Sequence, residues 1–196
     1  QQVLQNPDEL TKKDWEDLEL LYDSEIRYVD HEIGRLLDQI EDATWLLTAD
    51  HGEEFYEHGD FGHKNRFYEE HVHVPMLLNT SGSGDVHDEL VGLNDVPVTL
   101  LEEVGITTPE NYQGVHLLEG DREHVLGGWS QDVGREPDKA RLMCRTTGGK
   151  YILNKKQETI EFFNLIDDPG ERENLHDEVD TTDYENAIRT FQKTIE

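Results

Sequence analysis

Cysteine, basic residues and long apolar runs are all scarce in this chain of 196 residues. The single cysteine, Cys144, excludes an intrachain disulfide. No stretch approaches the roughly 18 to 20 consecutive apolar residues of a membrane-spanning helix, so no membrane span is expected. Hydrophobic residues make up only 34% of the chain, but they recur at regular intervals. That periodicity predicts a folded protein and not a disordered one.

Basic residues number 17 against 45 acidic ones, which gives a formal net charge of -28. Such a charge repels phosphate backbones, so nucleic acid is not an expected partner. The acidic residues are spread along the whole chain, and they form neither an acidic tail nor an EF-hand loop that would bind Ca²⁺. A uniform excess is typical of proteins from very salty cells, where dense counterions screen the self-repulsion. We therefore interpret the chain as halophilic, which favours the cytoplasm of a halophile as its location.

The first quarter of the chain has the pattern of a long helix followed by a strand. Apolar residues from Trp15 to Ile40 recur at steps of three and four, which is one face of a helix, and Thr11 with Asp14 forms a capping box before it. The opposite face is charged, so we expect the helix to pack on a sheet. Residues 44–49 are short, apolar and partly β-branched, which is typical of a buried strand in a parallel sheet.

The middle of the chain has weaker signals. A second apolar strand is expected over residues 72–78, where Pro75 indicates an edge or a bulge. A short strand is expected over residues 90–93, followed by a helix that continues to Val104 and ends at Gly105.

The pattern changes after Gly120, where short strands replace longer elements. Four strands are expected, over residues 123–129, 140–145, 150–154 and 159–164. Residues 147–149 give a hairpin turn signal, and residues 183–195 form an amphipathic helix. We therefore expect an α/β part over residues 1–119 and a small antiparallel sheet covered by a helix over residues 120–196.

Metal-ligand chemistry is suggested by Asp50, His51 and Gly52, which directly follow the first predicted strand. Ligands bind at this end of strands in open α/β sheets. Neighbouring side chains of a strand point to opposite faces, so Asp50 and His51 can share one ion only where the strand has ended, and Gly52 permits that turn. Carboxylate and imidazole groups bind divalent metals. A histidine that is merely hydrogen-bonded at a strand end is the alternative interpretation.

Several longer motifs occur in a fixed order. They are ADHGEEFYEHG from residue 49, GH from 62, FYEE from 67, HVPMLL from 73, DVPVTLLEEVGI from 95, GVHLL from 114 and FFNLIDDPGERENL from 162, after the helix LYDSEIRYVDHEIGRLLDQI from 21. Together these motifs resemble the C-terminal signature of sulfatases in the alkaline phosphatase superfamily, over roughly residues 15–195. The resemblance implies the C-terminal part of an alkaline-phosphatase-like sheet with flanking helices.

The resemblance also assigns roles to particular residues. Sulfatases hold one divalent ion, usually Ca²⁺, with Mg²⁺ or Mn²⁺ as alternatives, and Asp50 and His51 match the later pair of its ligands. Family members often place a lysine thirteen residues after this aspartate, where it contacts the sulfate. His63 occupies that position here and Lys64 follows it. The resemblance therefore implies an anion-binding or leaving-group role for His63, with Lys64 as a substitute, and a small-molecule sulfate or phosphate ester as substrate.

The family nucleophile is where this sequence departs from the pattern. Sulfatases use a formylglycine made from the cysteine or serine of a Cys-x-Pro-x-Arg-like motif. Cys144 is followed by Arg145 and two threonines, with neither the proline nor the matching arginine, so we expect it to be buried in the small sheet. No upstream Asp-Asp pair is present. We therefore expect this chain to be the C-terminal part of a longer enzyme, with a missing N-terminal segment as its partner.

Three hypotheses about function follow. The first is metal-dependent hydrolysis of sulfate esters by the complete protein. The second keeps the fold and changes the substrate: a phosphodiesterase, a phosphonate monoester hydrolase or a phosphoglycerol transferase of the same superfamily. The third is a catalytically silent fragment or assembly module, because the isolated chain lacks the nucleophile motif.

Overall fold

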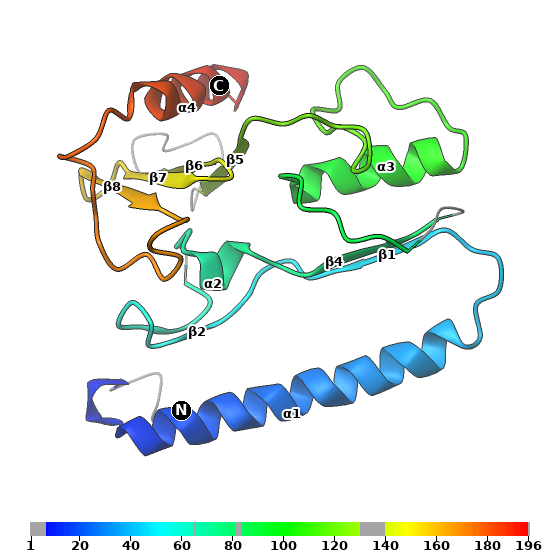
Figure 1. Ribbon diagram of the computed structural model, residues 1–196, viewed down its shortest axis with the longest axis horizontal. Coiled ribbons are helices and arrows are strands. Elements are labelled where there is room, and N and C mark those ends of the chain that lie inside the picture. The colour runs from blue at the N-terminus through cyan, green and yellow to red at the C-terminus, as the bar shows by residue number, and fades with distance from the viewer. Residues whose placement is uncertain (1–6, 65, 81–83, 130–139, 196) are drawn as a thin grey trace. The chain divides into compact units, whose positions relative to one another are not determined.

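The computed structural model describes residues 7–64, 66–80, 84–129 and 140–195 (Figure 1). The chain divides into two compact units. The first unit contains Gln1–Lys64 and His73–Ser83, and the second contains Asn65–Val72 and Gly84–Glu196. The division expected between residues 119 and 120 stays a prediction. None of the helices in the described part of the chain has the length and hydropathy of a membrane span.

The first unit begins with a short 3₁₀ turn, η1 (Pro7–Glu9), and the long helix α1 (Lys12–Leu37). The capping box is confirmed: the Thr11 hydroxyl accepts the Asp14 amide at 3.3 Å, and the Asp14 carboxylate accepts the Thr11 amide at 2.8 Å. These two bonds satisfy backbone donors that the first turn of a helix leaves unpaired.

The apolar face of α1 is packed in its N-terminal half, where Trp15 is buried and the ring centroid of Tyr22 lies 5.1 Å from that of Phe55. Trp15 is the buried residue of the helix, and its ring stacks on Tyr56 with 5.0 Å between centroids. Further along the same face Ile26, Val29 and Leu36 are exposed among the described residues. The expectation that the whole face packs on a sheet is therefore not met in the part of the chain that the structure describes.

Strand β1 (Trp45–Thr48) pairs with β4 (Met76–Asn79), and the pairing is antiparallel, with Thr48 opposite Met76. The expected parallel partner is therefore wrong for the described residues. A parallel pair needs a crossover that carries the chain back to the end where it started. The connection between β1 and β4 contains no such crossover in its described residues. It forms a small hairpin of β2 (Glu54–Phe55) with β3 (Phe61–Gly62), followed by the single-turn helix α2 (Glu69–Val72).

Strand β4 is shorter than the expected segment of residues 72–78, because Val72 ends α2 and Pro75 lies just before the strand. Proline has no N–H for the ladder, so this position outside the paired residues fits its chemistry.

The second unit includes η2 (Leu93–Asp95) and α3 (Val96–Glu103). The short strand expected over residues 90–93 is wrong, because the buried Asp95 carboxylate organises this segment as a turn. It accepts the Gly92 amide at 2.8 Å and the Val115 amide at 2.9 Å, and it pairs with Arg122. The expected end of the helix is confirmed by Gly105, whose φ is +74°.

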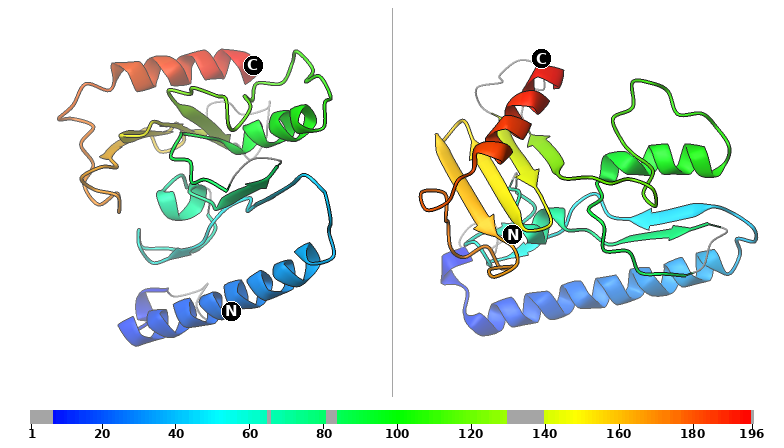
Figure 2. Two further views of the ribbon diagram at one scale, coloured as in Figure 1. Left: turned by 45° about the vertical axis from the view of Figure 1, so that its right-hand side comes forward. Right: turned by 45° about the horizontal axis from the view of Figure 1, so that its top comes forward.

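All four C-terminal strands and the last helix are confirmed. They are β5 (Val125–Trp129), β6 (Arg141–Arg145), β7 (Gly149–Asn154), β8 (Thr159–Asn164) and α4 (Thr182–Ile195). The strands form an antiparallel sheet in chain order, and α4 lies across one face of it (Figure 2). Between them the core contains Leu142, Cys144, Tyr151, Phe162 and Ile188.

A buried ion-pair cluster joins α2 to this sheet. The ammonium of Lys150 is fully buried, 2.7 Å from a Glu69 oxygen and 2.8 Å from a Glu171 oxygen. The Arg145 guanidinium adds two bonds of 3.0 Å to Glu69. Burial raises the pKa of Glu69, but the bonds from Arg145 and Lys150 outweigh it and lower this pKa to about 2. Burial raises the pKa of Glu171 against the pull of Lys150.

Candidate metal and anion site

The backbone turns directly after β1, and this turn brings Asp50 and His51 to the same side. An Asp50 carboxylate oxygen lies 3.8 Å from Nε2 of His51, and the other carboxylate oxygen accepts the His51 amide at 3.1 Å. Both groups reach solvent, with 90% of the Asp50 side chain and 40% of the His51 side chain exposed. The two side chains can therefore approach one ion, which an extended strand would prevent.

The β2–β3 hairpin supplies the neighbouring residues. Its register places Glu54 opposite Gly62, so Glu53 and His63 are the next residues outward on the two strands. Directly opposed residues of an antiparallel pair are close enough for their side chains to interact. The hairpin therefore brings together two residues that are ten positions apart in the sequence.

The hairpin tip is held by Glu54, which is fully buried. Its carboxylate accepts the backbone amides of His58 at 3.0 Å and Asp60 at 2.8 Å. Tyr56 and Gly59 have φ values of 79° and 78°, a left-handed conformation that a residue such as tyrosine rarely adopts. Buried hydrogen bonds of this kind offset such local strain, so the tip conformation is fixed by Glu54.

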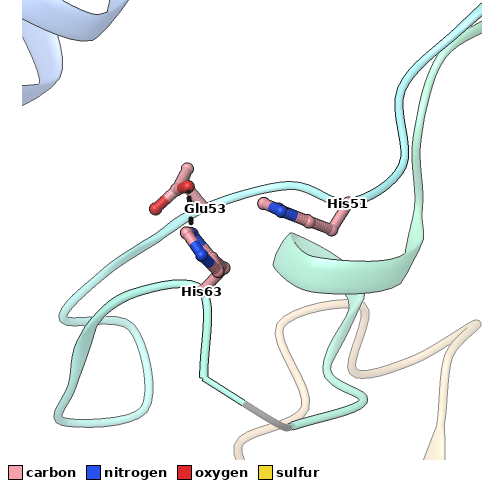
Figure 3. Close-up of side chains that lie close together, drawn as sticks. All are labelled: His51, Glu53 and His63. Atoms are coloured by element: carbon pink, nitrogen blue, oxygen red, sulfur yellow. Dashed lines mark hydrogen bonds and ion pairs between the residues drawn. The ribbon is translucent and has the colours of Figure 1, made fainter.

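Three side chains meet beside the strand end, as Figure 3 shows. Nδ1 of His63 lies 2.8 Å from Oε1 of Glu53. The His63 ring also lies against the ring of His51, with 4.2 Å between centroids and 30° between planes. One donor atom from each of the three residues lies within 4.8 Å of the others. Glu53 is not among the candidate residues that the sequence motifs indicate, because only the hairpin brings it beside His63.

Lys64 is not part of this group. Its ammonium forms an ion pair with Asp60 of the hairpin, which turns the side chain toward the hairpin tip. Of the two residues considered for anion binding, the structure thus brings His63 beside His51 and directs Lys64 elsewhere.

Cys144 lies in the core of the four-stranded sheet in the second unit, as expected. Only 1% of it is exposed, and burial raises the pKa of its thiol to about 12. The thiolate is the reactive form of cysteine, so this residue is chemically inert in the folded chain.

The donor set fits a divalent cation. Nδ1 of His51 lies 3.0 Å from the Gly52 carbonyl, which orients the ring and leaves Nε2 as the ring nitrogen that could coordinate an ion. Nε2 together with the Asp50 carboxylate gives one nitrogen and up to two oxygen donors on an open surface. Mixed oxygen and nitrogen sets suit Mn²⁺, and oxygen-rich sets suit Ca²⁺ and Mg²⁺.

Known proteins are similar in sequence to this chain over most of its length. The sulfatase family model matches residues 7–106. Arylsulfatase K from dog is 28% identical over 186 residues, which cover 84% of this chain and 35% of that protein. An arylsulfatase from Clostridium perfringens is 25% identical over 200 residues, which cover 95% of this chain and 41% of that protein.

The fold is shared with solved structures. The phosphonate monoester hydrolase of Agrobacterium radiobacter superposes with a TM-score of 0.75 at 20% identity, covering 95% of this chain and 42% of that one. This likeness confirms the expected alkaline-phosphatase-like α/β fold. The chain spans 35% to 41% of the length of the two curated relatives described above.

Proposed function

Because this chain belongs to the sulfatase family, as the match over residues 7–106 shows, we propose that it supplies part of the metal site of an enzyme that hydrolyses sulfate esters. The observation that carries the proposal is the strand-end pair, Asp50 and His51, open to solvent with His63 beside it. The ester would be a small molecule, in keeping with the arylsulfatases that the chain resembles.

Asp50 and His51 would hold one divalent ion, Ca²⁺ in the first instance and Mg²⁺ or Mn²⁺ as alternatives. When bound, the ion supplies Lewis-acid chemistry at the ester oxygens. Asp50 contributes a negative charge that is exposed and ready to pair with a cation. His51 contributes a ring nitrogen whose orientation is set by the Gly52 carbonyl, 3.0 Å from its other nitrogen.

His63 would bind the anionic ester beside the ion. Its Nδ1 is occupied by Glu53, so the opposite ring nitrogen, Nε2, is the one available to a substrate oxygen. A protonated imidazole there would stabilise the charge that develops on the ester in the transition state. Lys64 is the substitute for this role, and its ion pair with Asp60 would first have to break.

The structural likeness to a phosphonate monoester hydrolase favours one second candidate, hydrolysis of phosphonate monoesters or phosphate diesters. Phosphoglycerol transfer belongs to the same group of reactions. Asp50, His51 and His63 would serve each of these substrates equally well, because all present a charged tetrahedral group. A silent fragment or assembly module is the remaining hypothesis, since the chain's one cysteine is buried.

A substrate panel tests the proposed reaction. The chain should be assayed together with an N-terminal segment that carries a sulfatase nucleophile motif, using an aryl sulfate, a phosphate diester and a phosphonate monoester with the same leaving group. We expect the highest kcat/KM for the aryl sulfate, loss of turnover on treatment with a metal chelator, and recovery when Ca²⁺ or Mn²⁺ is added back.

A phosphonate or diester preference in the same panel would replace the first function with the second. Absence of turnover on every substrate, with metal bound and both segments folded, would favour the assembly module. The isolated chain serves as the control and is expected to be inactive on all three substrates.

A further inference from the structure

Glu53 is the hydrogen-bonding partner of the His63 ring. Nδ1 of His63 lies 2.8 Å from Oε1 of Glu53, which is the geometry of a hydrogen bond. We propose that Glu53 is a positioning residue that holds His63 in one tautomer, with Nε2 as the only ring nitrogen presented to the ester. This inference rests on the anion-binding role proposed above for His63.

The chemistry of the pair decides where the proton lies. A carboxylate offers only acceptor atoms, so the hydrogen of this bond belongs to Nδ1 of His63. When the ring is neutral, Nε2 then carries the lone pair, and when the ring is protonated, Nε2 carries an N–H. In both forms the carboxylate fixes the ring orientation and leaves the same atom, Nε2, available for substrate.

The hairpin explains why this pair forms. The register of β2 and β3 places Glu53 and His63 at neighbouring strand ends, and Gly62 has a φ of +81° at the last paired position. Glu53 lies against Gly62, since a Cβ at Gly62 would stand 3.5 Å from a Glu53 oxygen. The Glu53 side chain is only 25% exposed, whereas that of His63 is 63% exposed. A carboxylate held by the hairpin thus orients a ring that reaches solvent.

The second contact of His63 restricts the ring further. His51 lies against its face at 4.2 Å between centroids, while Glu53 bonds to its edge. A lysine at position 63 would have neither the flat face nor the second nitrogen that these contacts use. Glu53 is therefore matched to histidine at this position. Reactivity depends steeply on such placement, because a shift of about 1 Å can reduce a rate by about 100-fold.

Two substitutions at Glu53 separate a hydrogen-bond role from a packing role. Glu53→Gln keeps an oxygen acceptor for Nδ1–H, whereas Glu53→Leu has a similar size and no acceptor. Glu25→Leu, at an exposed position of α1, is the matched control for loss of a carboxylate. In the 196-residue chain, unchanged backbone amide signals of His58 and Asp60 would show that the hairpin remains folded in each variant.

The direct measurement is ¹⁵N NMR of the His63 ring in the 196-residue chain, at a pH where the ring is neutral. We expect Nδ1–H in the wild type and Glu53→Gln, and a shift to Nε2–H in Glu53→Leu. In the complete enzyme, kcat/KM for an aryl sulfate should fall by about 10- to 100-fold in Glu53→Leu and stay within about threefold in Glu53→Gln.

The inference is overturned if Glu53→Leu keeps the Nδ1–H tautomer, or if Gln and Leu reduce kcat/KM equally. Failure of the proposed function has a different signature. There, His63→Ala and Asp50→Ala would both leave turnover unchanged, whatever the NMR spectrum of the Glu53 variants shows.

Discussion

Asp50→Ala is expected to abolish metal binding at this site and to reduce turnover of the complete enzyme by at least about 1,000-fold. A metal Lewis acid stabilises the transition state by several kcal/mol, and each 1.4 kcal/mol corresponds to a factor of about ten in rate. The loss should appear in kcat/KM for the aryl sulfate. Metal affinity should be measured separately by isothermal titration, so that binding and catalysis are both observed.

The folded state should tolerate this change. The Asp50 side chain is 90% exposed, and its bond inside the protein is to the amide of the next residue. Substitutions at such positions usually change stability by less than about 0.5 kcal/mol. Asp30→Ala, at an exposed position in α1, is the matched control and should leave turnover and affinity unchanged. Retained turnover in folded Asp50→Ala would rule out the metal assignment.

Lys150→Met is expected to destabilise the second unit by about 3–5 kcal/mol. Lys150 is fully buried between Glu69 and Glu171, so its removal leaves two neighbouring carboxylates without its charge, although Arg145 still pairs with Glu69. The measurement is urea unfolding followed by far-UV circular dichroism at constant ionic strength. Lys156→Met, at an exposed turn position, is the control and should change stability by less than about 0.5 kcal/mol.

The same cluster gives a pH dependence with a defined sign. The folded pKa of Glu69 is about 2, below its ordinary value of 4.5, so its contribution to stability is present above pH 4.5 and is lost as the pH falls toward 2. Burial acts on Glu171 in the opposite direction and raises its pKa. In Lys150→Met, protonation of these carboxylates removes their repulsion. The loss in free energy of unfolding relative to wild type should therefore be smaller at pH 5 than at pH 7.

A double-mutant cycle separates charge from packing at this position. If the uncompensated carboxylates cause the loss, Lys150→Met with Glu171→Gln should be more stable than Lys150→Met alone. Equal stability of the single and double variants, with no dependence on pH, would show that the cluster contributes only through packing. The interpretation of the chain as halophilic stays a prediction. Because salt screens the repulsion between acidic residues, all variants should be compared at one fixed salt concentration.

Local signals explain which parts of the fold the sequence predicts correctly. Thr11 and Asp14 cap α1 because capping involves residues three positions apart. The strands of the C-terminal sheet and the turn before Gly149 follow from alternation and turn chemistry within short windows. Cys144 is buried as expected because it follows the apolar residues Leu142 and Met143 in the middle of its strand.

Contacts between residues distant in the sequence account for the features of the fold and of the site that the sequence did not predict. The antiparallel partner of β1 lies about thirty residues away, and strand composition alone does not reveal direction. Tyr56 adopts a positive φ that no residue pattern indicates, so the hairpin that brings Glu53 to His63 was not predicted. Lys64 and His63 are adjacent in sequence, and their different directions follow from contacts across the hairpin, with Asp60 for Lys64 and with Glu53 for His63.

We infer that Asp50 and His51 bind the same cation at the end of β1. Crystals of the complete protein grown with Mn²⁺ test it through anomalous scattering. We expect one anomalous peak within about 2.0–2.6 Å of both an Asp50 oxygen and Nε2 of His51. A fully occupied peak elsewhere, with these two side chains directed away from it, would rule out a shared cation.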